Sequence, residues 1–249
     1  MESGLAWRMF RRTRRPAPRV ADGTLVYAIG DIHGRVDLLE QTLVKIDAEQ
    51  GGSALARVEV YLGDYIDRGP ASREVLERLI RRSRECHTVF LKGNHESCAL
   101  EFLENPAVLN EWAQFGALAT LMSYGLRPPL NASAAEQVDL WSAFRAALPP
   151  AHSDFLARLR PSFTSGDFFF VHAGVRPGLA LSAQRDQDLM WIRDDFLLYE
   201  KEFEKMIVHG HTPVREPEFR ENRINIDTGA YATGRLTCLR IEGEACTVL

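Results

Sequence analysis

The chain has little cysteine and no long uncharged apolar run. Its four cysteines form neither a Cys-x-x-Cys pair nor a zinc-ribbon spacing, so neither a disulfide framework nor a cysteine-based zinc site is expected. A domain of 249 residues can bury a full core without disulfides, so we expect reduced thiols in a cytoplasmic protein. The absence of an apolar run of about 18 residues argues against a membrane span.

The chain also lacks a strong excess of charge of one sign, since its formal net charge is -4 at pH 7. This balance argues against a dedicated nucleic-acid binder. The average conceals a basic start, in which residues 1–19 carry arginines and a single acid, Glu2. We interpret residues 1–22 as a basic, disordered leader, rather than as a segment that binds anionic lipid, nucleic acid or a partner. Residues 23–249 are then one domain.

Three segments near the start of that domain read as buried strands, each running into a loop that contains glycine and polar residues. They are residues 24–29, 58–62 and 88–91. Apolar residues at helical spacing lie between them, and Ser72 is placed to cap the second helix. This alternation indicates a βαβ arrangement, in which ligands gather at the carboxyl ends of the strands.

Residues 97–160 interrupt this rhythm and read as helical throughout. Trp112 to Met122 predict one helix ended by Gly125, and a second follows Ser133, which has capping-box spacing to Glu136. We interpret the segment as a helical insertion beside the site, with its aromatic stripe in the core. Strand patterns return later, at residues 168–171, 206–208 and 224–226 and in a closing hairpin over 236–249.

The loops after the strands supply carboxylate, amide and imidazole groups: Asp31, His33, Asp64, Asn94, His172 and His211. Such oxygen and nitrogen ligands without thiolate suit divalent manganese, iron, zinc or cobalt. Six candidates exceed one tetrahedral site, whereas two ions that share a bridging carboxylate would use them all. Asp64 and Asp67 also lie three residues apart after an apolar run, and two like charges held there need a cation or an arginine nearby.

Five motifs in order carry a family resemblance. They are Gly-Asp-x-His-Gly (30–34), Gly-Asp-x-x-Asp-Arg-Gly (63–69), Gly-Asn-His-Glu (93–96), His-Ala-Gly (172–174) and Gly-His-Thr-Pro (210–213). Together they resemble the calcineurin-like metallophosphoesterases, and most closely the bacterial and phage branch of the serine/threonine phosphoprotein phosphatases. The resemblance covers about residues 24–240. Pro213 stands where nuclease-like and phosphodiesterase branches have a second histidine, which argues against those branches.

The resemblance implies an α/β fold of central mixed β-sheets, packed as a sandwich and flanked by helices. It implies two divalent metal ions, manganese first, with iron, zinc, cobalt or nickel as alternatives. Asp31 and His33 would bind one ion, Asp64 would bridge, and Asn94, His172 and His211 would bind the other. His95 would be the general acid, oriented by Asp67, and Arg68 would bind phosphate. Arg193, in Trp191-Ile192-Arg193, fits the position of a second phosphate-binding arginine.

The implied activity is hydrolysis of phosphomonoesters by direct attack of metal-bound hydroxide. Our first interpretation is a serine/threonine or dual-specificity protein phosphatase, and the alternative is a hydrolase of dinucleoside polyphosphates such as diadenosine tetraphosphate. The partner is accordingly a phosphorylated protein or a nucleotide, and the oligomeric state is open. A non-catalytic binding module is a third interpretation. The presence of all the motif residues argues against it.

Four further polar residues need an interpretation. We expect His209 to be packed or hydrogen-bonded near the site and not to bind metal. Asp227 either orients a ligand histidine or is a turn residue before Thr-Gly. His87 and His152 lie outside every motif, and we expect both at the surface.

Overall fold

The computed structural model describes residues 16–49 and 55–249. Most of the predicted leader, residues 1–15, lies outside the described residues. The end of the leader contacts the domain, because the Arg19 amide donates to Asp167 Oδ2 at 3.1 Å and the Val20 amide to Gly243 O at 3.0 Å. Val20 is also buried. The described chain contains no helix long and apolar enough to cross a membrane.

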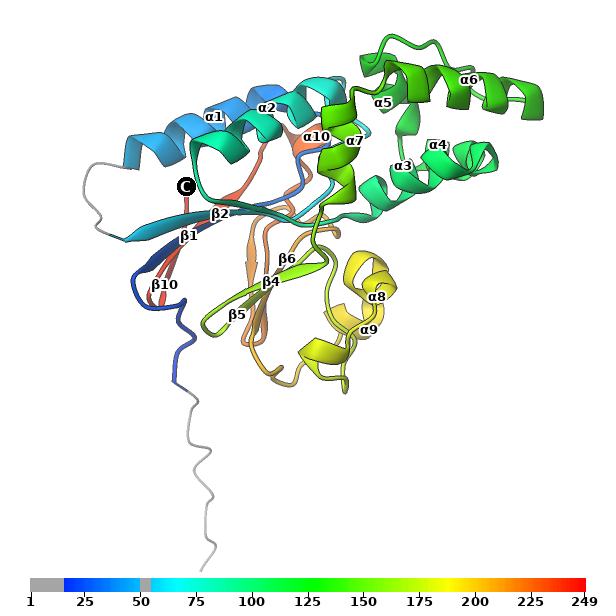
Figure 1. Ribbon diagram of the computed structural model, residues 1–249. Helices are drawn as coiled ribbons and strands as arrows, with labels where there is room; N and C mark the ends of the chain where they lie inside the picture. Colours follow the sequence, from blue (N-terminus) through cyan, green and yellow to red (C-terminus); the bar gives the residue numbers. More distant parts are fainter. Residues whose placement is uncertain (1–15, 50–54) are drawn as a thin grey trace, which may run out of the picture.

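Two mixed five-stranded sheets form the centre of the molecule. In the first, the parallel strands β1 (Thr24–Ile29), β2 (Ala56–Tyr61) and β3 (Thr88–Phe90) are extended by the antiparallel hairpin β9 (Cys238–Glu242) and β10 (Ala245–Val248). In the second, β5 (Phe168–Val171), β6 (Met206–His209) and β8 (Arg223–Asn225) are parallel, with β4 (Ser162–Ser165) and β7 (Glu218–Phe219) antiparallel at the edges. The predicted sheets, and their place between helices, are confirmed (Figure 1).

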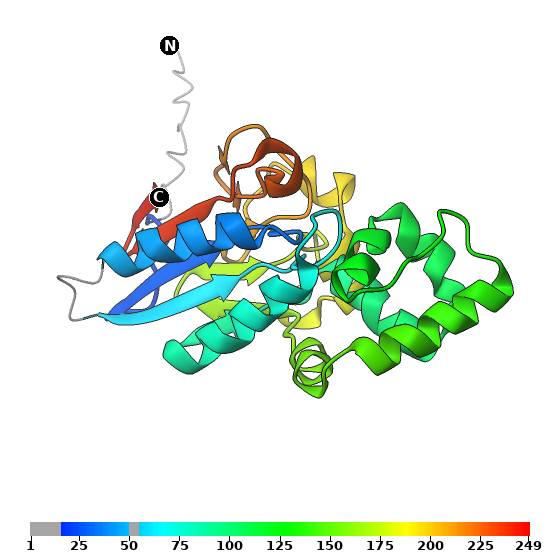
Figure 2. The same ribbon diagram turned by 90° about the horizontal axis from the view of Figure 1, so that it is seen from above.

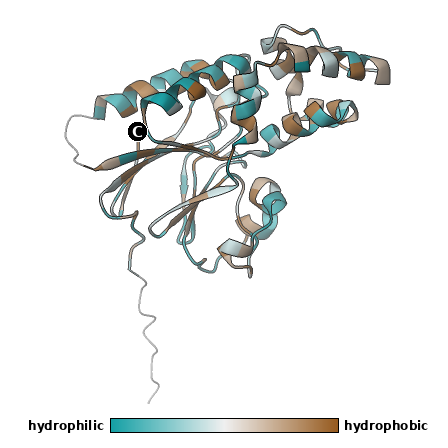
Figure 3. Cartoon of the chain, viewed as in Figure 1, coloured by the Kyte–Doolittle hydropathy of each residue, from teal (hydrophilic) through white to brown (hydrophobic). Residues whose placement is uncertain are grey.

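Both faces of the first sheet are buried. Alternate residues of β1 point to opposite faces, so Val26 and Ala28 pack against Phe168 and Phe170 of the second sheet. Leu25, Tyr27 and Ile29 face the helices instead. Hydrophobic residues accordingly run along the strands in Figure 3. This two-sided burial explains why β1 reads as a nearly continuous apolar run.

Helices α1 (Val36–Ala48) and α2 (Ser72–Glu85) cover the outer face of the first sheet (Figures 1 and 2). The predicted capping role of Ser72 is wrong. The N-cap of α2 is Ala71, and Ser72 Oγ accepts a hydrogen bond from the Asp67 amide at 3.0 Å. The serine therefore supports the preceding loop and not the helix end.

The helical insertion is present, and projects to one side of the sandwich (Figure 1). It contains α3 (Asn94–Glu104), a 3-10 turn at Pro106–Val108, α4 (Leu109–Gln114), α5 (Ala117–Ser123), α6 (Ala134–Ala147) and α7 (Pro150–Ala157). The predicted single helix around Trp112 to Met122 is wrong, because Gly116 breaks it with φ +103°, and Met122 is 62% exposed. A Cβ at Gly116 would lie 2.9 Å from the Arg68 amide nitrogen, so the break lets the insertion approach the site loop. The Ser133–Glu136 capping box is confirmed.

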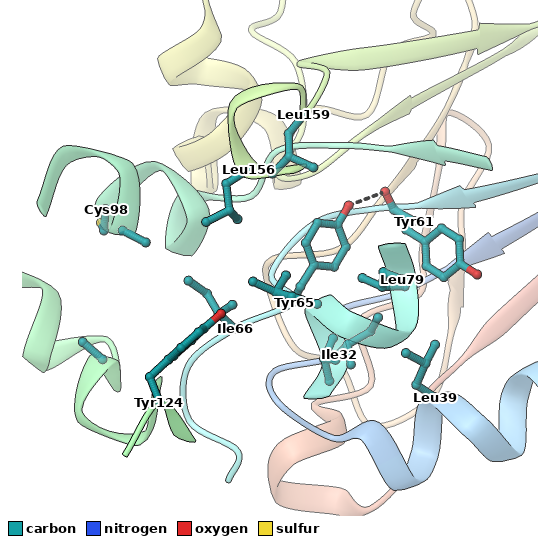
Figure 4. Close-up of a cluster of buried hydrophobic side chains, with 14 of the residues drawn as sticks. Ile32, Leu39, Tyr61, Tyr65, Ile66, Leu79, Cys98, Tyr124, Leu156 and Leu159 are labelled. Carbon is teal, nitrogen blue, oxygen red and sulfur yellow. Dashed lines mark hydrogen bonds between the residues drawn. The ribbon is translucent and has the colours of Figure 1, made fainter. Parts of the chain in front are cut away.

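A buried aromatic and aliphatic cluster joins the insertion to the first sheet. Figure 4 shows Tyr61 and Tyr65 of the sheet side, with Tyr124 and Leu156 contributed by the insertion. The Tyr65 hydroxyl donates to Leu91 O at 2.6 Å and to Tyr61 O at 3.2 Å. Because Tyr65 follows Asp64, this packing also fixes the loop that carries the predicted bridging carboxylate.

His152 is buried in this region, so its predicted surface position is wrong, whereas His87 is exposed. The His152 ring packs edge-on against Tyr124 at 5.8 Å, with Nδ1 at 2.7 Å from the tyrosine hydroxyl. Burial lowers the pKa of His152. The Tyr124 hydroxyl therefore gives the buried His152 Nδ1 a hydrogen-bond partner, which the sequence did not indicate.

Replacing His152 by glutamine is expected to flatten the pH dependence of stability below neutrality. The folded-state pKa of His152 is lowered, so below about pH 6.5 the unfolded chain binds a proton that the folded chain does not. The contribution of His152 to the free energy of unfolding is fully present above that pH. It is lost as the pH falls, by up to about 1.4 kcal/mol per pH unit. Denaturant unfolding at about pH 7.5 and 5.5 measures the difference. The exposed control, His87→Gln, should keep the wild-type pH dependence of stability. An equal pH dependence in the two variants would contradict the role given to His152.

Candidate active site

The predicted site residues lie on loops at one end of the two sheets. Asp31 and His33 follow β1, Asp64 to Arg68 follow β2, and Asn94 and His95 begin α3 after β3; His172 and His211 follow β5 and β6. Parallel pairing brings the carboxyl ends to one edge within each sheet, and the packing of the two sheets brings these edges together. Within the described ranges, the non-glycine residues with positive φ are all predicted site residues: His33, Asp64, Asp67, Arg68 and His211. Backbone strain is thus concentrated at this edge, as it commonly is at functional sites.

One cluster of side-chain atoms gathers around Asn94 Oδ1. His211 Nδ1 lies 2.9 Å and His172 Nε2 3.0 Å from this oxygen, and the two ring nitrogens are 3.2 Å apart. Asp64 Oδ1 lies 3.4 Å from His172 Nε2. Three residue types that commonly bind transition metals therefore meet at one point, as the sequence predicted.

A second cluster uses the other carboxylate oxygen of Asp64. Asp64 Oδ2 lies 3.5 Å from His33 Nε2 and 3.6 Å from His95 Nε2. Asp31 contacts the loop after β6, where its Oδ2 accepts from the His211 amide at 3.0 Å. Asp64 thereby presents one oxygen to each cluster, the arrangement expected of a bridging ligand.

The donor atoms themselves suit a pair of divalent cations. Asp31 Oδ1 and His33 Nε2 are buried and have no hydrogen-bond partner among the described residues. Burial without a partner is costly for such atoms unless a ligand satisfies them. His33 Nδ1–H donates to Ile66 O and His172 Nδ1–H to Leu62 O, each at 2.9 Å, which leaves both Nε2 lone pairs facing the clusters. The residues present therefore fit two metal ions.

The electrostatics give the same result. Burial, with the nearby Asp227 and Asp64 carboxylates, raises the pKa of Asp31. Burial also lowers the pKa of His33 to about 3, despite the attraction of Asp64. The imidazole of His33 is held neutral, which is the state required of a metal ligand, and a bound cation would offset the repulsion between the crowded carboxylates.

His95 and Asp67 form a separate buried pair. His95 Nδ1 lies 2.7 Å from Asp67 Oδ2, and burial lowers the His95 pKa, but Asp64 and Asp67 outweigh it, so the net pKa is raised. Asp67 also accepts from Trp112 Nε1 at 2.7 Å and from Thr120 Oγ1 at 2.5 Å. The sequence placed Trp112 in the core and gave Thr120 no role. Their contribution depends on the fold of the insertion, and no local motif indicates it.

Glu96 holds the loops of the site together, a role that the sequence analysis did not assign. Its carboxylate accepts from the backbone amides of Gly93 and of Asp64, Tyr65 and Ile66, at 2.7 to 3.3 Å. The loops approach so closely that a Cβ at Gly63 would lie 2.6 Å from the Gly93 nitrogen. The only sequence signal was the position of Glu96 at the end of the third motif.

The two arginines each lie beside one of the clusters. Arg68 Nη2 lies 3.3 Å from His95 Nε2, and its guanidinium lies 4.7 Å from the centre of the Tyr231 ring. Arg193 is exposed and donates to Thr212 Oγ1 at 3.3 Å, one residue after His211. Tyr231, in α10 (Ala230–Thr233), was missed because a lone exposed tyrosine carries no pattern.

The contacts of His209 and Asp227 indicate what each residue does. His209 is buried, 4.9 Å from the Phe196 ring, and its Nδ1 lies 3.1 Å from Gly210 O, so its predicted packing is confirmed. Asp227 accepts from the Gly229 amide at 2.8 Å, which is the turn role. Burial raises the pKa of Asp227 to about 6.

Comparisons with known proteins agree with this geometry. A model of the calcineurin-like phosphoesterase family matches residues 24–239. Relatives from Halalkalibacterium halodurans and Anoxybacillus flavithermus, both named asymmetrical bis(5'-nucleosyl)-tetraphosphatase PrpE, are each 27% identical, over 85% of this chain and 88% of theirs.

Solved structures share the fold. A protein provisionally named a diadenosine tetraphosphatase superposes with a TM-score of 0.60 at 19% identity, over 94% of this chain and 97% of its own. A cold-active protein tyrosine phosphatase superposes with a TM-score of 0.54 at 19% identity, over 93% of this chain and 81% of its own. The matched family model covers most of the chain, including all five motifs. The chain therefore belongs to the calcineurin-like phosphoesterase family and is a metal-dependent phosphoric ester hydrolase.

Proposed function

We propose that the site hydrolyses a phosphate bond with two divalent ions, manganese first. Asp31 and His33 would hold one ion, Asn94, His172 and His211 the other, and Asp64 both; the partnerless buried atoms of Asp31 and His33, and the meeting of Asn94, His172 and His211 at one point, support this assignment. Such ions, when bound, neutralise charge on the phosphate and make hydroxide available near neutral pH. Iron, zinc, cobalt or nickel would suit the same donors.

The chain's own groups supply binding and proton transfer. Arg68 and Arg193 grip phosphate oxygens, because a planar guanidinium pairs with phosphate through two hydrogen bonds. His95 Nε2 gives its proton to the leaving oxygen, since Nδ1 is held by Asp67 and the raised pKa favours the protonated ring. Arg68 lies beside His95 and so can bring the phosphate and the acid together.

The substrate we propose is a dinucleoside polyphosphate, cleaved asymmetrically. Our first interpretation of the sequence was a phosphoprotein, and the nucleotide was the alternative. The names of the relatives, similar over 85% of this chain, reverse that order, and this similarity is the observation that carries the proposal. The motifs indicate that a phosphate reacts at the site, but they do not indicate which group is attached to that phosphate.

Side-by-side kinetics on diadenosine tetraphosphate and a phosphoserine peptide test the proposal. With manganese present, kcat/KM for the dinucleotide is expected to exceed that for the peptide by at least about tenfold, and ATP and AMP should be the products. A preference for the peptide would restore the protein phosphatase interpretation. No turnover of either substrate, or of p-nitrophenyl phosphate, with several divalent ions would favour a non-catalytic module.

A further inference from the structure

An open pocket of about 550 Å³ lies beside the predicted site, against α8 (Asp186–Trp191) and α9 (Asp194–Leu197). Its lining residues are Arg176, Arg185, Gln187, Asp188, Trp191 and the segment 192–195. Because Arg193 is one of them, the pocket begins at a residue proposed to hold the reacting phosphate. Figure 1 shows α8 and α9 beside the second sheet.

Trp191 forms the boundary between this pocket and the ligand clusters. Its ring centre lies 6.4 Å from that of His211 and 5.4 Å from that of Phe115 of the insertion. The side chain is half-buried and also lines the pocket. A substrate whose reacting phosphate is at the clusters can therefore extend directly into the pocket.

The pocket wall is braced by Arg176. Its guanidinium donates to Asp188 at 2.6 and 3.0 Å and to Asp195 at 3.1 Å. Its backbone amide donates to Gln184 Oε1 at 2.7 Å, and Gln184 Nε2 donates back to Arg176 O. Arg176 thus offsets one of the two negative charges of its acidic partners and ties the loop to both helices.

Two lining arginines make no hydrogen bond to a carboxylate within the described residues, although Arg185 is near enough to Asp188 to help lower the pKa of that carboxyl. Arg185 makes no side-chain hydrogen bond or ion pair within the part of the chain that the structure describes, and Arg193 contacts Thr212 only through an uncharged hydroxyl. They flank α8, which rises about 9 Å over its six residues. The pocket therefore offers cations at two separate positions, one of them away from the clusters.

We propose that this pocket binds the part of the substrate that lies beyond the reacting phosphate, on the side of Arg193. Arg185 contacts a phosphate beyond the one that reacts, and the indole of Trp191 packs against the nucleoside, since guanidinium groups pair with phosphates and indoles stack on bases. The inference rests on the proposed dinucleoside polyphosphate activity. It assigns Arg185 to substrate selection, because a small phosphomonoester carries no further phosphate to place there.

The kinetic test uses Arg185→Ala. The KM for diadenosine tetraphosphate is expected to rise about tenfold more than the KM for p-nitrophenyl phosphate, with partial recovery in Arg185→Lys. Arg84→Ala, an exposed arginine on α2, is the matched control and should leave both KM values unchanged. Equal changes for the two substrates would overturn the assignment of Arg185.

A binding measurement separates this inference from the proposed activity. Calorimetry with inorganic tripolyphosphate, in excess manganese, should give a Kd about tenfold weaker for Arg185→Ala than for wild type, and orthophosphate should show a smaller difference. If the enzyme does not hydrolyse diadenosine tetraphosphate, the proposed function fails while this result still decides the role of Arg185. A tripolyphosphate Kd within about twofold of wild type would overturn the pocket assignment.

Discussion

Replacing Asp64 by asparagine is expected to lower kcat/KM by about 1000-fold or more and to reduce the metal content of the purified protein. Asp64 directs one oxygen toward His172 and the other toward His33, so it is the charge common to both clusters. Loss of about 4 kcal/mol of electrostatic stabilisation corresponds to that factor. Asparagine is the appropriate replacement because Asp64 has φ +51°, a conformation that asparagine adopts more readily than alanine.

Elemental analysis and p-nitrophenyl phosphate turnover measure the two effects of the Asp64→Asn change together. Asp139→Asn is the matched control, because this exposed residue of α6 loses the same charge far from the clusters. Its metal content and turnover should equal those of wild type. An Asp64→Asn protein with full metal content and turnover within tenfold of wild type would refute the bridging role.

Replacing His95 by alanine is expected to lower kcat by about 100- to 10,000-fold, the usual contribution of a general acid. The Nδ1 of His95 is bound to Asp67, and Nε2 lies beside Arg68, so the ring is positioned to protonate a leaving oxygen next to bound phosphate. The loss should be larger for an alkyl phosphate than for p-nitrophenyl phosphate, because nitrophenolate leaves without needing a proton. Metal content should change less than in Asp64→Asn.

A comparison of leaving groups decides whether His95 acts as an acid. Equal losses for alkyl and nitrophenyl phosphates would indicate that the residue only binds or organises the site. Thr120→Val provides a milder perturbation of the same pair, since it removes a hydrogen bond to Asp67 Oδ1 without touching His95. It should reduce turnover of the alkyl phosphate more than that of the nitrophenyl ester.

Much of the fold and site could be predicted from local sequence. The strands at residues 24–29 and 168–171 have the predicted bounds, because a run of apolar residues before a glycine-rich loop has few other solutions. The predicted metal-ligating residues could be picked out because each lies shortly after a strand, whereas Arg193 follows α8 and was chosen by its position after Trp191. Parallel pairing brings the predicted ligands together within each sheet; the packing of the two sheets brings the two groups to one site.

The predictions that failed depended on contacts between distant segments. His152 lacks any pattern that separates a surface histidine from a buried one, and only the packing of Tyr124 buries it. Ser72 has a capping position by spacing, but the hydroxyl serves the Asp67 loop once α2 and the site are packed together. The helix around Trp112 breaks at Gly116 because the backbone must pass close to Arg68.

The sequence by itself determined which chemical groups this protein brings to its site, since each motif places a particular side chain at the end of a strand. Only the tertiary structure decided how those groups are held and what lies around them. The amides bound by Glu96, the donors to Asp67 and the pocket at Trp191 all join segments far apart in the chain. Spacing along the sequence determines local geometry, whereas hydrogen bonds and packing across loops depend on the complete fold.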